Sequence, residues 1–128
     1  MIIAGLGYRK AISAAQVESA LAAAVRRACL TDDQIGLIAV PAWKGAEPGI
    51  RLAAAARGLP VVLVEQPALE AANSRTVTRS PRSQAALNVH SVAEAAALAA
   101  AGAAGRLLTP RIAVGPVTCA LAEGKLPT

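Results

Sequence analysis

The chain has 128 residues, of which 55% are hydrophobic and 2% aromatic, and its formal net charge is +5 at pH 7. This length fits one domain with a buried core, and no apolar run is long enough and free enough of charge to span a bilayer. Aromatic residues are too few for the stacking surface that single-strand binders use. We therefore expect no membrane partner and no nucleic-acid partner.

The cysteine and histidine content bounds the compartment and the cofactors. Cys29 and Cys119 are far apart and form no Cys-x-x-Cys pair, so we expect two buried thiols in a reducing, cytoplasmic compartment. The N-terminus has no basic stretch before its apolar residues, which argues against a signal peptide. One histidine and two separated cysteines do not make a zinc site, and we expect neither a metal nor a cofactor.

The N-terminal stretch predicts a strand, a tight turn and a helix. Residues 2–6 are apolar and predict a strand covered on both faces, as in a parallel sheet. Gly5 and Gly7 predict a turn where the backbone approaches a ligand, because ligands of open α/β folds lie beyond the carboxyl ends of the strands. Arg9 would bring positive charge to that ligand. Ser13 and Gln16 form a capping box for the following helix.

The pattern then repeats. Residues 35–40 predict a second strand, and the loop after it carries Trp43, Lys44 and Glu47. A helix over residues 49–57 stops at Gly58, residues 61–64 predict a third strand, and Gln66 begins another helix. This β-α-β-α-β alternation predicts a parallel sheet.

The second half has weaker signals. Residues 73–87 predict a loop, in which 76–78 could add a short edge strand, and Ser91 with Glu94 predicts a capped helix to about residue 101. Residues 107–114, interrupted by Pro110, and 117–121 predict the last strands. The fold class is thus α/β, a three-layer α/β/α domain over residues 1–122 with a mostly parallel sheet of about five strands, followed by a flexible tail over 123–128.

Several constellations have more than one interpretation. Gly5-x-Gly7 resembles a dinucleotide fingerprint, but Lys10 occupies its third position and no acidic residue follows the second strand. Lys44 and Glu47 form either a solvated ion pair or a charge donor with a general base. His90 is more often a loop residue than a base at such a place. Ser91 as N-cap leaves N–H groups that suit an anion, and capping alone accounts for Glu94.

Four segments together resemble a known family. They are Gly5-Leu6-Gly7-Tyr8-Arg9, Trp43-Lys44-x-x-Glu47-Pro48-Gly49, Ser91-Val92-Ala93-Glu94-Ala95-Ala96 and Thr118-Cys119-Ala120. The series, which covers nearly the whole chain, resembles the CobE family of cobalamin biosynthesis. That family is similar to the C-terminal domain of CbiG, the cobalt-precorrin-5A hydrolase, which opens a lactone on the macrocycle and releases acetaldehyde.

The resemblance implies a protein that binds, or also processes, a polycarboxylate corrin or precorrin intermediate, with other enzymes of the pathway as further partners. The implied substrate-binding residues are Gly5, Gly7, Tyr8, Arg9, Trp43, Lys44, Glu47, His90, Ser91 and Thr118. In the alternative of a lactone-opening hydrolase, Glu47 would be the base or would position water, and Lys44 would polarise a carbonyl. A second alternative, a phosphate or nucleic-acid binding module, rests on net charge and the glycine turn alone. The sequence does not indicate an oligomeric state.

Overall fold

The computed structural model describes residues 1–8, 11–44, 47–79, 89 and 91–124, apart from the side chain of Lys44. The strands are β1 (Ile2–Tyr8), β2 (Ile35–Pro41), β3 (Val61–Val64), β4 (Arg106–Val114) and β5 (Val117–Glu123). The α-helices are α1 (Ala14–Arg27), α2 (Pro48–Arg57), α3 (Gln66–Ala72) and α5 (Val92–Ala101), and the 3-10 turns are η1 (Asp32–Gln34), η2 (Ala42–Lys44) and η3 (Asn73–Arg75).

The five strands form one mixed sheet in the order β3-β2-β1-β5-β4. The pairs β1–β2 and β2–β3 are parallel, whereas β1–β5 and β4–β5 are antiparallel. The predicted number of strands is confirmed, but the prediction of a mostly parallel sheet is wrong. The reason is a two-residue hairpin at Gly115, whose φ of 58° suits a tight connection between antiparallel neighbours.

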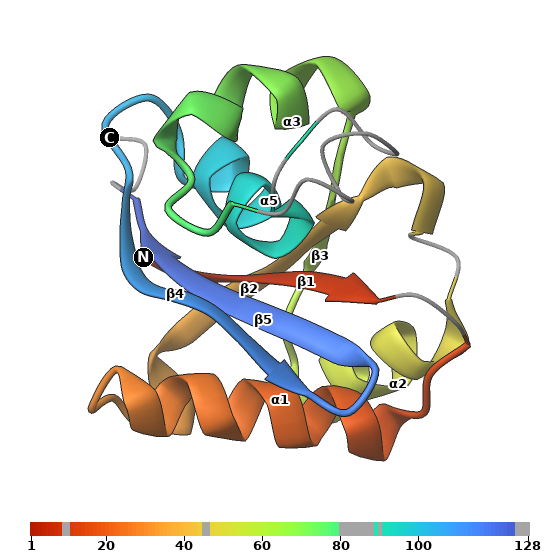
Figure 1. Cartoon of the computed structure of the whole chain (residues 1–128). Coiled ribbons are helices and arrows are strands. Elements are labelled where there is room, and N and C mark those ends of the chain that lie inside the picture. The colour runs from red at the N-terminus through yellow and green to blue at the C-terminus, as the bar shows by residue number, and fades with distance from the viewer. Residues whose placement is uncertain (9–10, 45–46, 80–88, 90, 125–128) are drawn as a thin grey trace.

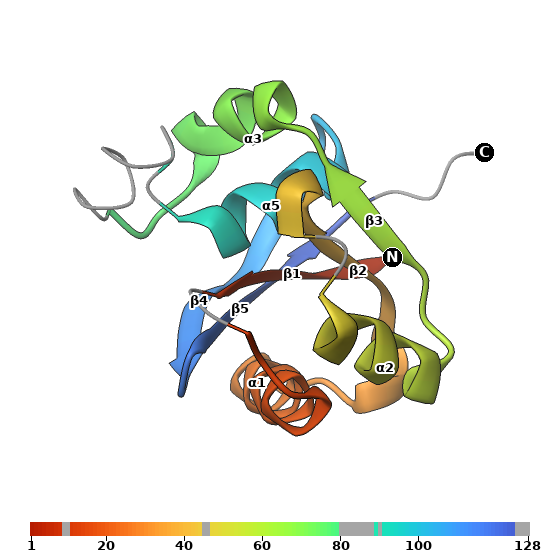
Figure 2. The same cartoon turned by 90° about the vertical axis from the view of Figure 1, so that its right-hand side faces the viewer.

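Helices cover both faces of the sheet. Helices α1 and α2 lie on one face, and α3 and α5 lie on the other (Figures 1 and 2). The first two crossovers move in the same direction across the sheet, from β1 to β2 to β3, and crossovers of one hand then place both helices on the same face. The chain returns to the far edge by way of α3 and α5, which cover the opposite face.

Each face has its own core, and the alternation of β1 feeds both. All seven residues of β1 are buried, as expected for a central strand. Ile2, Ala4, Leu6 and Tyr8 belong to the core under α1 and α2. Ile3 belongs to the core under α3 and α5, where alanines supply much of the packing. Gly5 and Gly7 share the phase of Ile3 and therefore face α5.

Helix α1 begins as predicted and ends differently. The Ser13 side chain accepts a hydrogen bond from Gln16 N, and the Gln16 side chain accepts one from Ser13 N, which confirms the capping box. At the other end the chain turns at Cys29, whose φ is 58°. Cys29 N donates to Arg26 O and Leu30 N to Val25 O, the two bonds of a Schellman motif.

This turn exposes Cys29, so the expectation of two buried thiols is wrong for one of them. Cys119 is buried in β5. Burial raises the pKa of its thiol to about 12, although Arg57 acts in the opposite direction. The two cysteines therefore have different access to solvent, and only Cys119 belongs to the core.

The second half contains further departures from expectation. Residues 76–79 form no strand, so the optional edge strand at 76–78 is absent. Strand β4 runs through Pro110 with register shifts on both sides of Thr109. An edge strand tolerates proline where the ladder is irregular, because the missing N–H then breaks no ladder bond.

The first and last described residues lie next to each other. Met1 N donates to Gly124 O and Gly124 N donates to Met1 O, each at 2.8 Å. Strand β5 continues to Glu123, one residue beyond the predicted domain end. The rest of the predicted tail, residues 125–128, lies outside the described residues.

Candidate functional site

The predicted glycine turn is part of a strand. Strand β1 continues to Tyr8, and Gly5, Gly7 and Tyr8 pair with Ala120, Thr118 and Val117 of β5. The expectation that the strand ends at residue 6 is therefore wrong, because β5 provides hydrogen-bond partners for two further residues. The carboxyl end of β1, where a ligand would bind, lies at Tyr8.

Gly5 has a packing role. A Cβ atom at this position would lie 2.1 Å from the Ala93 carbonyl oxygen and 2.8 Å from the Ala97 Cβ atom. Real Cβ atoms do not approach so closely, so Gly5 allows α5 to rest directly on β1. Because α5 covers this backbone, Gly5 is not available to a ligand, and we do not include it in the proposed site.

Gly7 lies near the carboxyl end of β1, where three elements meet. A Cβ atom on Gly7 would lie 2.8 Å from Thr118 Oγ1 and 3.6 Å from Ala93 N. The Thr118 hydroxyl donates to the Gly7 carbonyl oxygen at 3.2 Å. The ends of β1 and β5 and the first turn of α5 are thus adjacent. The structure brings together Gly7, Thr118 and the start of α5, which the resemblance implied to be parts of one site.

Ser91 caps α5 in only half of the predicted manner. Its side chain is buried and accepts a hydrogen bond from Glu94 N at 3.3 Å. In a complete capping box, the Glu94 carboxylate would return to Ser91 N. It instead accepts from Val77 N at 2.7 Å, Thr78 N at 3.0 Å, the Thr78 hydroxyl at 2.5 Å and Arg111 N at 2.8 Å. Capping alone is therefore an insufficient account of Glu94.

Glu94 joins α5 to two segments that are distant in sequence, although its side chain is fully buried. Burial alone would raise the pKa of this carboxyl, but the bonds from Thr78, Arg111 and Val77 outweigh it, and the pKa lies below its usual range. The residue thus stays ionised and holds its neighbours in place. Its charge also lies in the first turn of α5, where a helix favours an anion.

Tyr8 and Glu47 lie on the opposite side of the sheet. Tyr8 packs in the core under α1 and α2 and is 8% exposed. Glu47 is the N-cap residue of α2, and its Oε1 atom accepts from Ile12 N at 3.3 Å. Burial, reinforced by the negative charge of Glu47, raises the Tyr8 pKa to about 12. Tyr8 is therefore a neutral phenol at any physiological pH.

The Glu47-Pro48-Gly49 segment also has a local structural role. A Cβ atom on Gly49 would lie 2.2 Å from the carbonyl oxygen of Ile12. Gly49 and Glu47 together dock the segment before α1 onto the start of α2. This contact fixes Ile12 and Ser13, directly before α1.

The remaining predicted residues are only partly described. Trp43 lies in η2, directly after β2, and is 46% exposed. Lys44 lies in the same turn, and its side chain is outside the described atoms. Arg9 and His90 are outside the described residues. In the sequence they adjoin Tyr8 and Ser91.

The described site residues therefore divide between the two faces of the sheet, at the end where β1 finishes and β5 begins. Gly7, Thr118 and Ser91 lie on the α5 side, and Tyr8 and Glu47 lie on the α1–α2 side. At this end of the sheet the Trp43 indole is exposed, whereas Tyr8 and the first turn of α5 are buried, and Glu94 already places a carboxylate in that turn. Of these described groups, the indole is therefore the one open to a flat apolar ligand. In the described part of the chain, no three His, Cys, Asp or Glu side chains come together as metal ligands.

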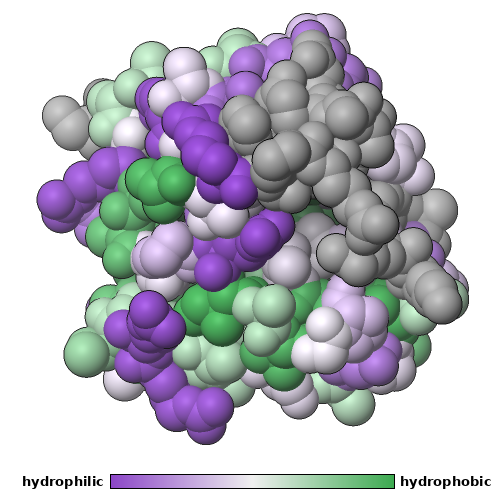
Figure 3. All heavy atoms as spheres, viewed as in Figure 1, coloured by the Kyte–Doolittle hydropathy of each residue, from purple (hydrophilic) through white to green (hydrophobic). Residues whose placement is uncertain are grey.

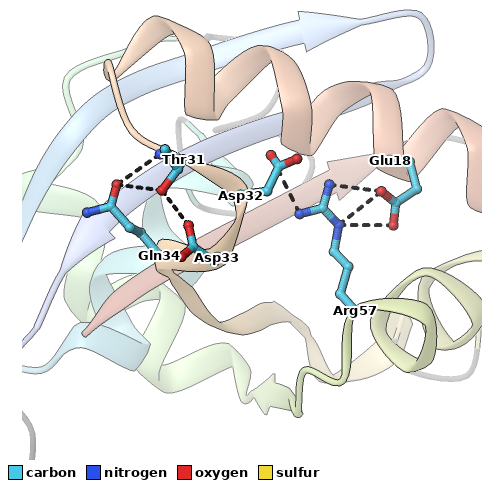
Figure 4. Close-up of polar contacts among 6 residues, drawn as sticks. All are labelled: Glu18, Thr31, Asp32, Asp33, Gln34 and Arg57. Atoms are coloured by element: carbon cyan, nitrogen blue, oxygen red, sulfur yellow. Dashed lines mark hydrogen bonds and ion pairs between the residues drawn. The ribbon is translucent and has the colours of Figure 1, made fainter.

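A hollow of about 660 Å³ lies elsewhere, between α1, α2 and η1. Glu18, Asp32 and Arg57 line it and form an ion-pair cluster (Figure 4). The view with β4 and β5 in front shows hydrophilic and hydrophobic side chains interspersed over its described surface (Figure 3). None of the helices in the described ranges is long and apolar enough to cross a membrane.

Comparison with known proteins agrees with the fold. The family model described as Cobalamin synthesis G C-terminus matches residues 2–122. CobE, a protein from the cobalamin (vitamin B12) biosynthetic pathway, has a crystal structure with a TM-score of 0.90 at 27% identity, covering 100% of this chain and 93% of that one. The cobalamin biosynthesis protein chiG from Agrobacterium tumefaciens gives 0.77 at 38% identity, covering 98% and 100%.

A third solved structure is informative for the fold alone. It is a cobalamin biosynthesis protein G homolog from Sulfolobus solfataricus, with a TM-score of 0.69 at 22% identity, covering 97% of this chain and 37% of that one. No curated protein matches the chain significantly. The chain has the same fold as CobE. Since the family model spans nearly all of the described residues, the chain belongs to the family of the C-terminal domain of cobalamin synthesis protein G.

Proposed function

We propose that this protein acts in cobalamin biosynthesis by binding a polycarboxylate corrin or precorrin intermediate at the carboxyl ends of β1 and β2. The observation that carries the proposal is that Gly7, Thr118 and the N-terminal turn of α5 lie together at the carboxyl end of β1. Family membership indicates the pathway, and residues at this end of the sheet suit the ligand.

The chemistry of such a macrocycle fits this end of the sheet. Its carboxylates suit the basic residues Arg9 and Lys44, which follow β1 and β2 in the sequence. Trp43 offers an exposed indole to the flat ring. Tyr8 stays protonated and so does not repel a polyanion.

The test is a titration of the purified chain with hydrogenobyrinic acid, followed through the visible spectrum of the ligand. We expect a saturable spectral change that Arg9→Ala, Lys44→Ala and Trp43→Ala each weaken. Arg106→Ala is the matched control for the two basic residues, because it also removes one positive charge. Arg106 pairs with Glu123 at the opposite end of the strands, away from the proposed site. No spectral change with the unaltered chain, or equal weakening by the control, would count against the proposal.

A turnover assay and an oligonucleotide-binding assay separate the alternatives. A lactone-opening hydrolase would lose turnover in Glu47→Gln while keeping its affinity, since glutamine can still accept from Ile12 N. A phosphate or nucleic-acid binding module would bind mixed oligonucleotides tightly and with strong salt dependence. Binding of the macrocycle without turnover, and without oligonucleotide binding, is the outcome that we expect.

A further inference from the structure

The hollow between α1 and α2, here called the α1–α2 groove, is independent of the proposed site. Its lining residues are Ala14, Ala15, Glu18, Asp32, Asp33, Ile35, Leu52, Ala53, Ala56, Arg57 and Leu59. Short alanine side chains from both helices leave the space open, and Leu52 stands 63% exposed beside it. The groove therefore combines an apolar wall with a cluster of charges.

The charge of the groove is opposite to that of the whole chain. Three carboxylates and one guanidinium give the lining a formal charge of −2, whereas the chain carries +5. The guanidinium is already engaged, because Arg57 Nε lies 3.0 and 2.9 Å from the two Glu18 carboxylate oxygens. Asp32, 66% exposed, lies 3.8 Å from the same group (Figure 4). The three carboxylates of the groove, Glu18, Asp32 and Asp33, are here called the acidic rim. They outnumber the one cation in the lining, and Asp32 is accessible to a partner.

A complementary basic feature lies on α1 itself. Arg26 and Arg27 form its last turn, are exposed, and make no ion pair within the described part of the chain. Glu18, on the groove side, precedes Arg26 by eight residues, which is about 12 Å along the helix axis. Between them α1 presents only small side chains to solvent, Ser19, Ala22 and Ala23.

These features fit each other across a two-fold axis. If two α1 helices lie antiparallel with the axis near Ala22, the partner's Arg26 comes level with Glu18, and the reverse contact is equivalent. The small residues at the centre allow the helices to approach closely. The helix dipoles are then also antiparallel, which is the favourable arrangement.

We propose that the α1–α2 groove is a self-association surface, in which the acidic rim of each copy receives the Arg26–Arg27 turn of a second copy. The proposal rests on charge complementarity within one chain and does not depend on the proposed function. Because its ion pairs are near the surface, the dimer is sensitive to salt.

The test is sedimentation velocity on the full chain and on reciprocal charge-swap variants. The unaltered chain should dimerise as its concentration rises, and the dimer should be weaker at about 0.5 M salt. Arg26→Glu/Arg27→Glu and Asp32→Lys/Asp33→Lys should each weaken dimerisation by at least about tenfold. An equimolar mixture of the two variants should dimerise again, because both contacts of the mixed pair are then complementary. The quadruple variant should also dimerise.

The control is Arg106→Glu/Arg111→Glu, which changes the charge by the same amount on β4 and should leave dimerisation unchanged. Thermal melting of every variant checks that it is folded, and recovery in the mixture excludes misfolding as the cause of a loss. A monomeric unaltered chain at high concentration and low salt would overturn the proposal. So would a dimer that both single-sign variants leave intact, or association of the groove only with a different protein.

Discussion

The two faces of the sheet hold their carboxylates in opposite ways. On the α5 face, Glu94 is fully buried and is held by backbone N–H groups and one hydroxyl, with no cation among these partners. On the α1–α2 face, Glu18 is 37% exposed and is held by the guanidinium of Arg57. A buried carboxylate that satisfies several donors is costly to remove, whereas a half-exposed ion pair contributes little. The comparison separates groups that maintain the fold from groups that are available for surface interactions.

The largest expected effect is at Glu94. Glu94→Ala removes a buried carboxylate that accepts from four donors, and we expect a loss of about 3–5 kcal/mol in the free energy of unfolding. Urea denaturation monitored by circular dichroism measures it. Glu94→Gln keeps one acceptor oxygen, so its free energy of unfolding should lie between those of the unaltered chain and Glu94→Ala. A loss below about 1 kcal/mol in Glu94→Ala would show that the α5 face does not depend on this carboxylate.

The next effect comes from the glycines that allow close packing. Gly5→Ala places a Cβ atom 2.1 Å from the backbone of α5, and Gly49→Ala places one 2.2 Å from that of Ile12. We expect each to destabilise the fold by about 1–3 kcal/mol or more, because backbone cannot move aside cheaply. Gly58, with positive φ but open space around it, is the control for the loss of glycine without a clash. Similar costs at all three positions would contradict the packing explanation.

Acid should weaken the α5 face. The folded pKa of Glu94 lies below its usual value, so its contribution is fully present above the unfolded pKa of about 4.3 and is lost as pH falls through the folded pKa. Urea midpoints between about pH 6 and pH 3 should therefore fall less steeply in Glu94→Gln than in the unaltered chain. Equal slopes in the two proteins would exclude Glu94 as a source of the acid sensitivity.

Alkali should weaken the other face. The folded pKa of Tyr8 is raised to about 12, so its contribution is fully present below the unfolded pKa of about 10 and is lost as pH rises through the folded value. Tyr8 is the only tyrosine, so the ultraviolet absorbance of tyrosinate reports on it alone. Glu47→Gln should lower the midpoint of the Tyr8 titration, because it removes the nearby negative charge. An unchanged midpoint in that variant would show that burial acts alone.

The smallest effect is at the surface ion pair. Glu18→Gln should cost less than about 1 kcal/mol, since solvent screens a pair of this exposure. Thermal denaturation at low and high salt measures it, and the small difference should shrink as salt rises. A cost close to that of Glu94→Ala would remove the contrast between the two faces.

The local features of this fold could be predicted from the sequence. Ser13 with Gln16, Gly58 after α2, and Gly102 after α5 mark helix ends through side-chain or backbone chemistry that acts over a few residues. The first three strands follow from apolar runs between these helices. The missed hairpin at Gly115 also had a local signal, a Gly-Pro pair between two apolar runs.

The candidate site could be predicted only in part, because its decisive contacts are long-range. Glu94 has the spacing of a capping residue, yet its partners Thr78 and Arg111 lie 16 and 17 residues away. Gly5 seemed to face a ligand, because nothing near it in sequence shows that α5 would cover it. Gly7 and Thr118 were predicted in one site from the resemblance, and their contact spans 111 residues.

The reciprocal bonds between Met1 and Gly124 have a consequence for chain topology. Because Met1 and Gly124 lie side by side, a short linker could join them, and the chain could be opened at another exposed connection without loss of the sheet order. The turn after α5, near Gly102, is such a connection. For the same reason, this domain can be joined to additional chain at a single place on its surface, with the carboxyl ends of β1 and β2 left uncovered.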